Sequence, residues 1–229
     1  MNLVRGRNPQ KAISALRNAQ CVFLDVDSTL SNQEGLDELA CYLGKYKVIC
    51  EMTEKAMSGE MTVEDAFAER IRLLSPTKQE ITSFLQSHVP QINPGVASFL
   101  SLLRKRGTEY YLVSGGFLEL IEPLCHVLQI PFDHVVCNHF RFASDGSCLG
   151  YDTTRWTCKS HGKSLAIRSI LESHGWVHSV MIGDGVTDLE TRDVVDAFIG
   201  YAGVKDREVV QNAADLSVTS FETLLPFLL

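Results

Sequence analysis

Short runs of apolar residues recur along the chain, and most of them alternate with stretches whose apolar spacing favours helices. The runs that favour strands lie at 21–24, 109–113, 135–137, 179–182, 197–199 and 216–218. Uninterrupted apolar runs of this length are typical of parallel strands that are buried on both faces. Their alternation with helices predicts an α/β fold built on a doubly wound parallel sheet.

One interval does not fit this alternation, because more than 80 residues separate the first predicted strand from the second. A single crossover helix needs far fewer residues. Within the interval, residues 34–43 carry apolar side chains at helical spacing, Thr62 and Asp65 resemble the start of another helix, and a third helix is predicted from 77 to about 87. We therefore expect a helical-bundle cap domain over 33–91, inserted into a catalytic core domain formed by 1–32 and 92–229.

Residues 138–152 show a different pattern, in which Phe140 and Phe142 alternate with polar residues ahead of the pair Asp145-Gly146. Asp-Gly is a frequent two-residue turn between antiparallel strands. The pattern therefore predicts a small β-hairpin outside the parallel sheet.

The composition is typical of globular proteins. The 229 residues are 45% hydrophobic and 21% charged, and no stretch approaches the roughly 18 uninterrupted apolar residues of a membrane span. A formal net charge of −7 makes nucleic acid a poor candidate partner.

The seven scattered cysteines include no C-x-x-C pair, which favours a reducing, cytoplasmic compartment. The basic first 24 residues resemble a transit peptide, but we prefer a surface helix, since the first predicted strand follows at once.

Carboxylates directly follow two of the predicted strands. Asp25 and Asp27 come after the first apolar run, and Asp184 and Asp188 come after the run that ends at Ile182. Parallel strands end at one edge of a sheet, and folds of this kind bind their ligands there. For each pair alone, a solvated or tight turn is the simpler interpretation. Together, with no His or Cys beside them, the two pairs favour a hard cation, Mg²⁺ over zinc.

Two further segments are suited to binding a phosphate group. A predicted strand leads into Ser114, Gly115 and Gly116 before a helical run, so a hydroxyl and bare amides meet the positive end of a helix. Lys163 opens the predicted helix 164–172, where the helix dipole alone would favour an anion. This mismatch indicates that Lys163 faces a phosphate, although without the other motifs a solvated lysine would be the simpler interpretation.

These four elements, in this order, resemble the haloacid dehalogenase superfamily of phosphatases. The segments at 23–40, 51–57, 114–117, 181–188 and 196–200 are similar to those of its phosphoserine phosphatases. The resemblance extends from about Gln20 to the C-terminus, and the chain departs from it at Ser58 and at Val186-Thr187. It implies a Rossmann-like core, Mg²⁺ as the cofactor and O-phosphoserine as a small-molecule substrate, hydrolysed in the last step of serine biosynthesis.

The resemblance also implies a role for each matching residue of the core. Asp25 is expected to be the nucleophile that forms an aspartyl-phosphate, and Asp27 the acid and then the base of the two displacements. Mg²⁺ is expected on Asp25, Asp184 and the main-chain carbonyl of Asp27, with Asp188 supporting these ligands. The residues expected to hold the substrate, chiefly by its phosphoryl oxygens, are Ser114, Gly115, Gly116, Lys163 and Thr187.

On the cap, the resemblance implies that Glu34 binds the substrate ammonium, that Met57 packs against the ligand and that Ser58 contacts its phosphate side. The alternative for Glu34 is a favourable first-turn residue of a helix, and Met57 is as readily explained as core filling. Arg70 has support from its own pattern, because it lies in the apolar stripe of its helix, where an unpaired charge is costly. A substrate carboxylate is its natural partner, since Arg offers bidentate geometry.

Three functions stay open at this point. The main interpretation is a Mg²⁺-dependent phosphoserine phosphatase that acts as a monomer or homodimer. A second is an enzyme for another small phosphomonoester, or one that transfers the phosphoryl group to another alcohol. A third is a non-catalytic module that keeps the fold for binding, and the intact Asp25, Asp27, Lys163 and Asp184 argue against it.

Overall fold

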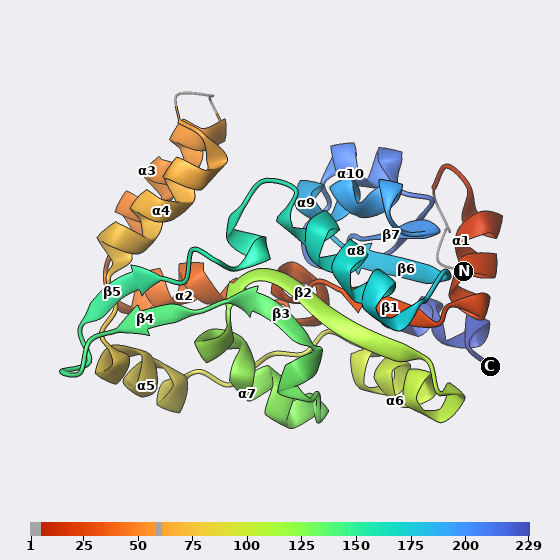
Figure 1. The fold of residues 1–229 in the computed structure, drawn as a ribbon, viewed down its shortest axis with the longest axis horizontal. Coiled ribbons are helices and arrows are strands. Elements are labelled where there is room, and N and C mark those ends of the chain that lie inside the picture. The colour runs from red at the N-terminus through yellow and green to blue at the C-terminus, as the bar shows by residue number, and fades with distance from the viewer. Residues whose placement is uncertain (1–5, 58–60) are drawn as a thin grey trace.

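The computed structural model describes residues 6–57 and 61–229, and its centre is a parallel sheet with helices on both faces (Figure 1). The strand order is β3-β2-β1-β6-β7-β8, and every neighbouring pair runs parallel. The strands are β1 (Cys21–Leu24), β2 (Glu109–Phe117), β3 (Val135–Asn138), β6 (Ser179–Gly183), β7 (Ala197–Tyr201) and β8 (Leu216–Val218). The predicted doubly wound α/β class is therefore confirmed.

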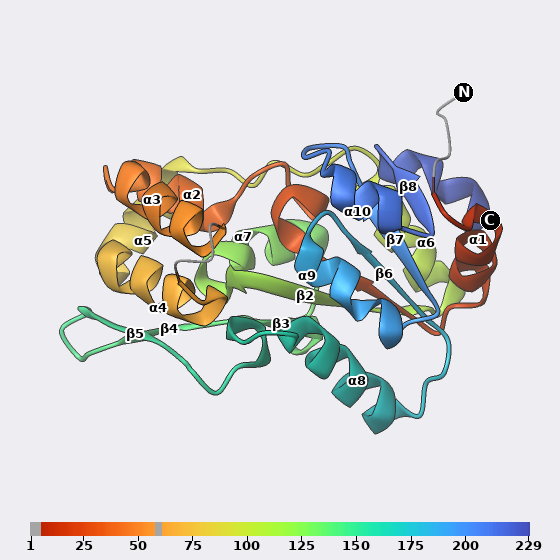
Figure 2. The same cartoon turned by 90° about the horizontal axis from the view of Figure 1, so that it is seen from above.

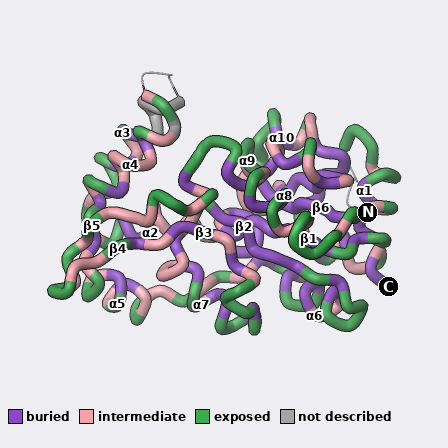
Figure 3. The backbone as a smooth tube through the Cα atoms, in the orientation of Figure 1, coloured by how far each residue is buried: buried purple, intermediate pink, exposed green. Residues whose placement is uncertain are grey.

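Every strand of the sheet except β8 contributes to two apolar clusters, one on either face of the sheet. Val22 and Leu24 of β1 belong to one cluster, while Cys21 and Phe23 belong to the other, because successive side chains of a strand alternate. The first face is covered by α1 (Pro9–Asn18), α6 (Val96–Arg106) and α7 (Leu118–Leu128), and the second by α8 (Gly162–His174), α9 (Val186–Leu189) and α10 (Glu208–Ala213) (Figure 2). Figure 3 shows the resulting buried sheet between helices with exposed outer sides.

Of the described helices that lie between β1 and β2 in the sequence, the four that precede α6 gather at one end of the molecule, away from α1 (Figures 1 and 2). They are α2 (Gly35–Tyr42), α3 (Tyr46–Met57), α4 (Val63–Leu74) and α5 (Lys78–Ser87). As expected, the Thr62 hydroxyl accepts a hydrogen bond from the Asp65 amide, and Thr77 begins α5 with a complete capping box. The sequence pattern did not indicate α3. The exact division at residues 33 and 91 stays a prediction.

The predicted hairpin forms from β4 (Phe140–Phe142) and β5 (Cys148–Tyr151), which pair antiparallel. Its Phe140 shares an apolar cluster with residues of α2 to α5, so the hairpin packs with the cap helices. No described helix is both long and apolar enough to cross a membrane. Short 3₁₀ segments complete the chain at Phe132–His134, Trp156–Cys158, Glu190–Asp193, Phe221–Thr223 and Leu225–Phe227.

Strand β2 is longer than its apolar run predicts. The sequence placed Ser114 to Gly116 in a turn before a helix, whereas these residues continue the strand to Phe117. The extended end of β2 is held by Asn138 of β3. Phe117 pairs with Asn138, and the Asn138 side-chain amide donates to the Gly115 carbonyl at 2.8 Å. Strand pairing therefore overrides the turn preference of the two glycines.

Candidate active site

A cavity of about 290 Å³ lies at the carboxyl edge of the sheet, next to the cap helices. Its wall combines the ends of three central strands with the loop before α8 and with Phe67 of the cap helix α4. The residues that line it are Asp25, Asp27, Glu34, Phe67, Gly115, Thr157, Cys158, Lys159, Ser160, His161, Gly162, Lys163, Asp184, Gly185, Thr187, Asp188, Glu190 and Arg207. Most of the core residues expected from the sequence thus meet in one place.

Asp25 is fixed at the point where β1 ends. Its amide still donates to the Ile182 carbonyl of β6 at 3.0 Å, and the chain then turns through Val26–Leu30, where Asp27 and Ser28 have non-helical backbone angles. Ser28 takes a positive φ of 57° inside this turn, and its amide donates to the Gln33 carbonyl at 3.2 Å. This bend directs both Asp25 and Asp27 to the same cavity.

Asp27 has the environment of a carboxyl that exchanges protons near neutral pH. Its Oδ1 accepts a hydrogen bond from the Gly35 amide at 2.9 Å. Burial, followed by the nearby Asp25 carboxylate, raises the pKa of Asp27 to about 7, although the Gly35 bond opposes this shift. A Cβ atom at Gly116 would lie only 2.9 Å from Asp27 Oδ2, so glycine at 116 makes room for the carboxyl.

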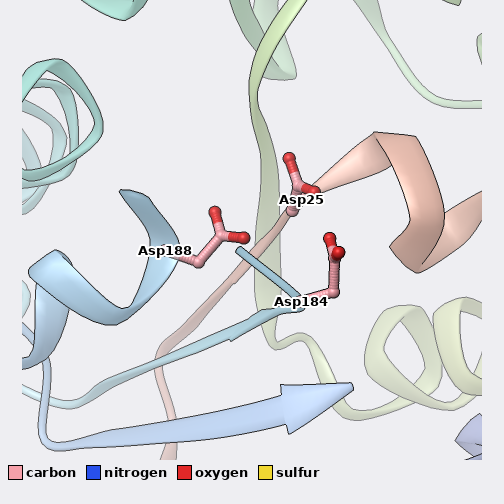
Figure 4. Close-up of side chains that lie close together, drawn as sticks. All are labelled: Asp25, Asp184 and Asp188. Carbon is pink, nitrogen blue, oxygen red and sulfur yellow. The ribbon is translucent and has the colours of Figure 1, made fainter. Parts of the chain in front are cut away.

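Asp25, Asp184 and Asp188 form an acidic cluster (Figure 4), in which one oxygen from each lies within 4.8 Å of the others. Their exposed fractions are 5%, 3% and 1%. Burial, followed by the Asp25 charge, raises the pKa of Asp184, and the same two causes raise the pKa of Asp188 to about 7. Buried carboxylates that repel one another are stabilised by a cation, and these hard oxygens suit Mg²⁺.

Two basic side chains and a hydroxyl hold this acidic cluster. Lys163 donates to Asp25 Oδ1 at 2.6 Å and to Asp188 Oδ1 at 2.5 Å. Burial alone would lower the pKa of Lys163, but these two carboxylates raise it above its usual value. Arg207 donates through Nε to Asp184 Oδ2 at 3.1 Å, and the Thr29 hydroxyl lies 3.3 Å from Asp184 Oδ1.

Thr29 and Arg207 are not among the residues predicted from the sequence. Arg207 could have been found, because it follows β7 and therefore comes from the same edge of the sheet as the carboxylates. Lys163 was expected to face a phosphate group, and the structure places it in the cavity wall between two carboxylates. Ser114 is buried and its hydroxyl accepts from the Gly116 amide at 2.9 Å, while Gly115 and Thr187 line the cavity.

The cap residues are held by ion pairs. Glu34 Oε1 accepts from the Ser28 hydroxyl and from Lys205 Nζ, each at 2.6 Å. Arg70 Nη2 donates to Asp37 Oδ1 at 2.9 Å, so part of the Arg70 charge has an internal partner, which the sequence pattern did not predict. The Arg70 Nε is buried and has no hydrogen-bond partner among the residues that the structure describes.

None of the other cap residues expected to bind the substrate, Arg70, Met57 and Ser58, is placed in the cavity wall by the described residues. Arg70 does not itself line the cavity, but Phe67, one helical turn earlier, does. Ser58 lies outside the described residues, and so does the Met57 side chain, although the Met57 main chain ends α3. Their expected contacts with the substrate therefore stay predictions.

Comparisons with known proteins show which family the chain is similar to. The haloacid dehalogenase-like hydrolase family matches residues 22–191. The chain is 38% identical to a chloroplastic phosphoserine phosphatase of Arabidopsis thaliana, over 95% of this chain and 75% of the relative. It is 37% identical to the phosphoserine phosphatase of Bos taurus, over 93% and 96%. The solved structure of DsGPDH of Dunaliella salina superposes with a TM-score of 0.83 at 31% identity, over 97% of this chain and 38% of that longer one.

Proposed function

The chain belongs to the haloacid dehalogenase-like hydrolase family, and from that premise we propose that it hydrolyses O-phosphoserine to serine and phosphate. One observation carries the proposal: Asp25, Asp27 and Lys163 meet in a cavity whose cap side holds Glu34. In this proposal Asp25 is the nucleophile, Asp27 the proton donor and Lys163 the cation that faces the phosphoryl group. Glu34 is the receptor for the amino group of the substrate. The reaction is a phosphomonoester hydrolysis through an aspartyl-phosphate.

In the first step, an Asp25 carboxylate oxygen attacks phosphorus, and the bond between phosphorus and the serine oxygen breaks. The proton that the leaving serine oxygen needs comes from Asp27, whose pKa of about 7 keeps a large share of the carboxyl protonated at neutral pH. Lys163, bonded to Asp25 Oδ1 at 2.6 Å, orients the nucleophile and offsets the negative charge of the incoming phosphate.

In the second step, a water molecule attacks the aspartyl-phosphate and Asp27, now ionised, accepts its proton. The bond between phosphorus and the Asp25 oxygen breaks, which restores the Asp25 carboxylate and releases phosphate. Ser114, Gly115, Gly116 and Thr187 are proposed to hold the phosphoryl oxygens through both steps, since they lie at the same edge of the sheet.

We propose that Asp25, Asp184 and the main-chain carbonyl of Asp27 hold Mg²⁺, with Asp188 in support. The acidic cluster fits such an ion, because its buried oxygens repel one another and raise the pKa values of Asp184 and Asp188. When bound, the ion supplies the positive charge that lets an anionic carboxylate approach an anionic phosphate. On the cap, Glu34 is proposed to bind the substrate ammonium and Arg70 its carboxylate, through the buried Nε that lacks a partner among the described residues.

The compartment and the assembly are also proposals. All seven cysteines are free thiols, which supports a reducing compartment such as the cytoplasm. We propose a monomer or homodimer, which size-exclusion chromatography with light scattering would distinguish.

The test is phosphate release from a panel of phosphomonoesters, measured with Mg²⁺ and after metal removal by EDTA. O-phosphoserine should give the highest kcat/KM, and Mg²⁺ should restore the activity that EDTA removes. Mg²⁺ should also raise the melting temperature of the wild type but not of Asp184→Ala. A different best substrate, or transfer of phosphate to an added alcohol in place of water, would favour the second interpretation. Full activity in EDTA would contradict the metal site.

A further inference from the structure

Lys205 lies in the loop after β7, together with Arg207, and reaches across to the beginning of the cap. Its Nζ is 2.6 Å from Glu34 Oε1, a contact between residues 171 positions apart in the chain. The same Oε1 also accepts from the Ser28 hydroxyl. Glu34 Oε2, in contrast, has no hydrogen-bond donor among the described residues. One carboxylate oxygen is therefore doubly held, while the other stays available to a ligand in the cavity that Glu34 lines.

The Glu34–Lys205 pair keeps both of its charges. Burial alone would raise the pKa of Glu34, but the bonds from Lys205 and Ser28 outweigh it and lower the pKa. The side chains are 34% and 40% exposed, so a dissolved substrate can reach both of them. The pair thus places the fixed positive charge of Lys205 directly beside the fixed negative charge of Glu34, the member of the pair that lines the cavity.

The head group of phosphoserine carries its ammonium and its carboxylate on a single carbon atom. Receptors for the two charges must therefore be neighbours with opposite signs, which is the arrangement of Glu34 and Lys205. Arg70 and Lys205 both lie outside the set of residues that line the cavity. Arg70 alone meets the requirement less well, because its Nη2 is bonded to Asp37, whereas Lys205 is bonded directly to the cavity residue Glu34.

We propose that Lys205 is a specificity-determining residue that binds the carboxylate of phosphoserine while Glu34 Oε2 binds the adjacent ammonium. The inference rests on the proposed function and adds to Arg70 a second carboxylate receptor, which comes from the core and lies beside the cavity residue Glu34. It has a distinctive consequence for phosphoethanolamine, which has the ammonium but no carboxylate. That substrate brings an ammonium close to the Lys205 ammonium and gains nothing in return, so Lys205 discriminates against it.

The experiment compares Lys205→Met with the wild type on three substrates: O-phosphoserine, phosphoethanolamine and p-nitrophenyl phosphate, which has neither charged group. Rates are expressed relative to p-nitrophenyl phosphate. For phosphoserine, the relative kcat/KM should fall about tenfold, mainly through KM, because a charged contact is lost. For phosphoethanolamine it should rise about two- to threefold, because a repulsion at a partly exposed site is removed. The opposite signs identify carboxylate binding.

Each other pattern overturns the inference. A loss for both amines would mean that Lys205 only orients Glu34, and a gain for both would mean that it competes with the substrate ammonium. Equal losses on all three substrates with a lower melting temperature would make the pair a structural brace. If the wild type released no phosphate from phosphoserine, the proposed function and this inference would fail together, whereas the other patterns reject the inference alone.

Two further variants serve as controls. Lys205→Arg keeps the positive charge and should retain most of the preference for phosphoserine over phosphoethanolamine. Lys11→Met removes a lysine that lies 3.9 Å from Asp215, away from the cavity, and should leave all three rates unchanged. A preference lost in Lys205→Arg as fully as in Lys205→Met would contradict recognition by charge.

Discussion

The two sides of the cavity differ in how firmly their charged side chains are held. On the sheet side, the side chains of Asp25, Asp188 and Lys163 are at most 8% exposed, and Lys163 bonds directly to both carboxylates. On the cap side, the side chains of Arg70 and Glu34 are 22% and 34% exposed, and each pairs with a partner of comparable exposure. The same types of charge therefore sit in two different environments.

This difference in burial suits the sheet side to catalysis and the cap side to recognition of the substrate. Breaking a buried ion pair costs about 3–5 kcal/mol, while an exposed pair contributes about 0–1 kcal/mol. The sheet side can therefore hold reacting groups in one geometry, whereas the cap side can exchange an internal partner for a substrate group at little cost. Substitutions on the sheet side should reduce turnover of every substrate, and substitutions on the cap side should act selectively.

The largest effect is expected for Asp25→Asn, which should reduce phosphate release from every substrate by more than about 10⁴-fold. An amide is nearly isosteric with the carboxylate but is not a nucleophile that can form the acyl-phosphate. Asp196→Asn is a matched control, since Asp196 lies outside the cavity and accepts from the Ser179 amide at 3.1 Å. Wild-type rates in Asp25→Asn would contradict the covalent mechanism.

A smaller but still general loss is expected for Asp27→Asn, which removes the proton donor. Phosphoserine hydrolysis should fall by about 10²–10⁴-fold, the usual contribution of a positioned acid. The loss for p-nitrophenyl phosphate should be clearly smaller, because its leaving oxygen needs no proton. Steady-state rates on both substrates decide the point, and equal losses would assign Asp27 a role other than proton transfer.

Much of the sheet side could be predicted from the sequence, because the positions of its residues follow from local pattern. Asp25 and Asp184 directly follow strands, and parallel strands bring their ends to one edge. The partners on the cap side could not be predicted in this way. The bond from Lys205 to Glu34 and that from Arg70 to Asp37 join residues 171 and 33 positions apart. Such pairs depend on how the cap meets the core, which no local pattern encodes.

A selective effect on the cap side is expected for Arg70→Ala. The KM for phosphoserine should rise about 10- to 100-fold. This rise is near the lower end of the losses that follow when one partner of a charge pair is truncated, because Arg70 is partly exposed. Phosphoethanolamine, which lacks the carboxylate, should change much less. Arg72→Ala is the matched control on the same helix, since Arg72 is 68% exposed and pairs with Glu69. Parallel losses on both substrates with a lower melting temperature would make Arg70 a brace of the cap.

The smallest effect concerns a contact that joins the two sides without touching the reacting groups. Glu64, near the start of α4, accepts a hydrogen bond through Oε1 from the Ser160 amide at 2.8 Å, and Ser160 belongs to the loop that lines the cavity before Lys163. This bond ties a cap helix to the core and makes no distinction between substrate head groups. Glu64→Ala should therefore raise KM about two- to fivefold, as expected for an exposed contact, and by the same factor for phosphoserine and p-nitrophenyl phosphate.

Glu64→Gln separates the hydrogen bond from the charge, because its side-chain carbonyl can still accept from the Ser160 amide. If the bond holds the cap against the core, Gln should keep KM within about twofold of the wild type while Ala does not. An equal rise in both variants would assign the effect to the negative charge of Glu64, which faces His161. A KM rise confined to phosphoserine would place Glu64 among the residues that select the substrate. A contact that joins the cap to the core would then also take part in recognition, and the comparison of a fixed sheet side with an exchangeable cap side would need a third class for it.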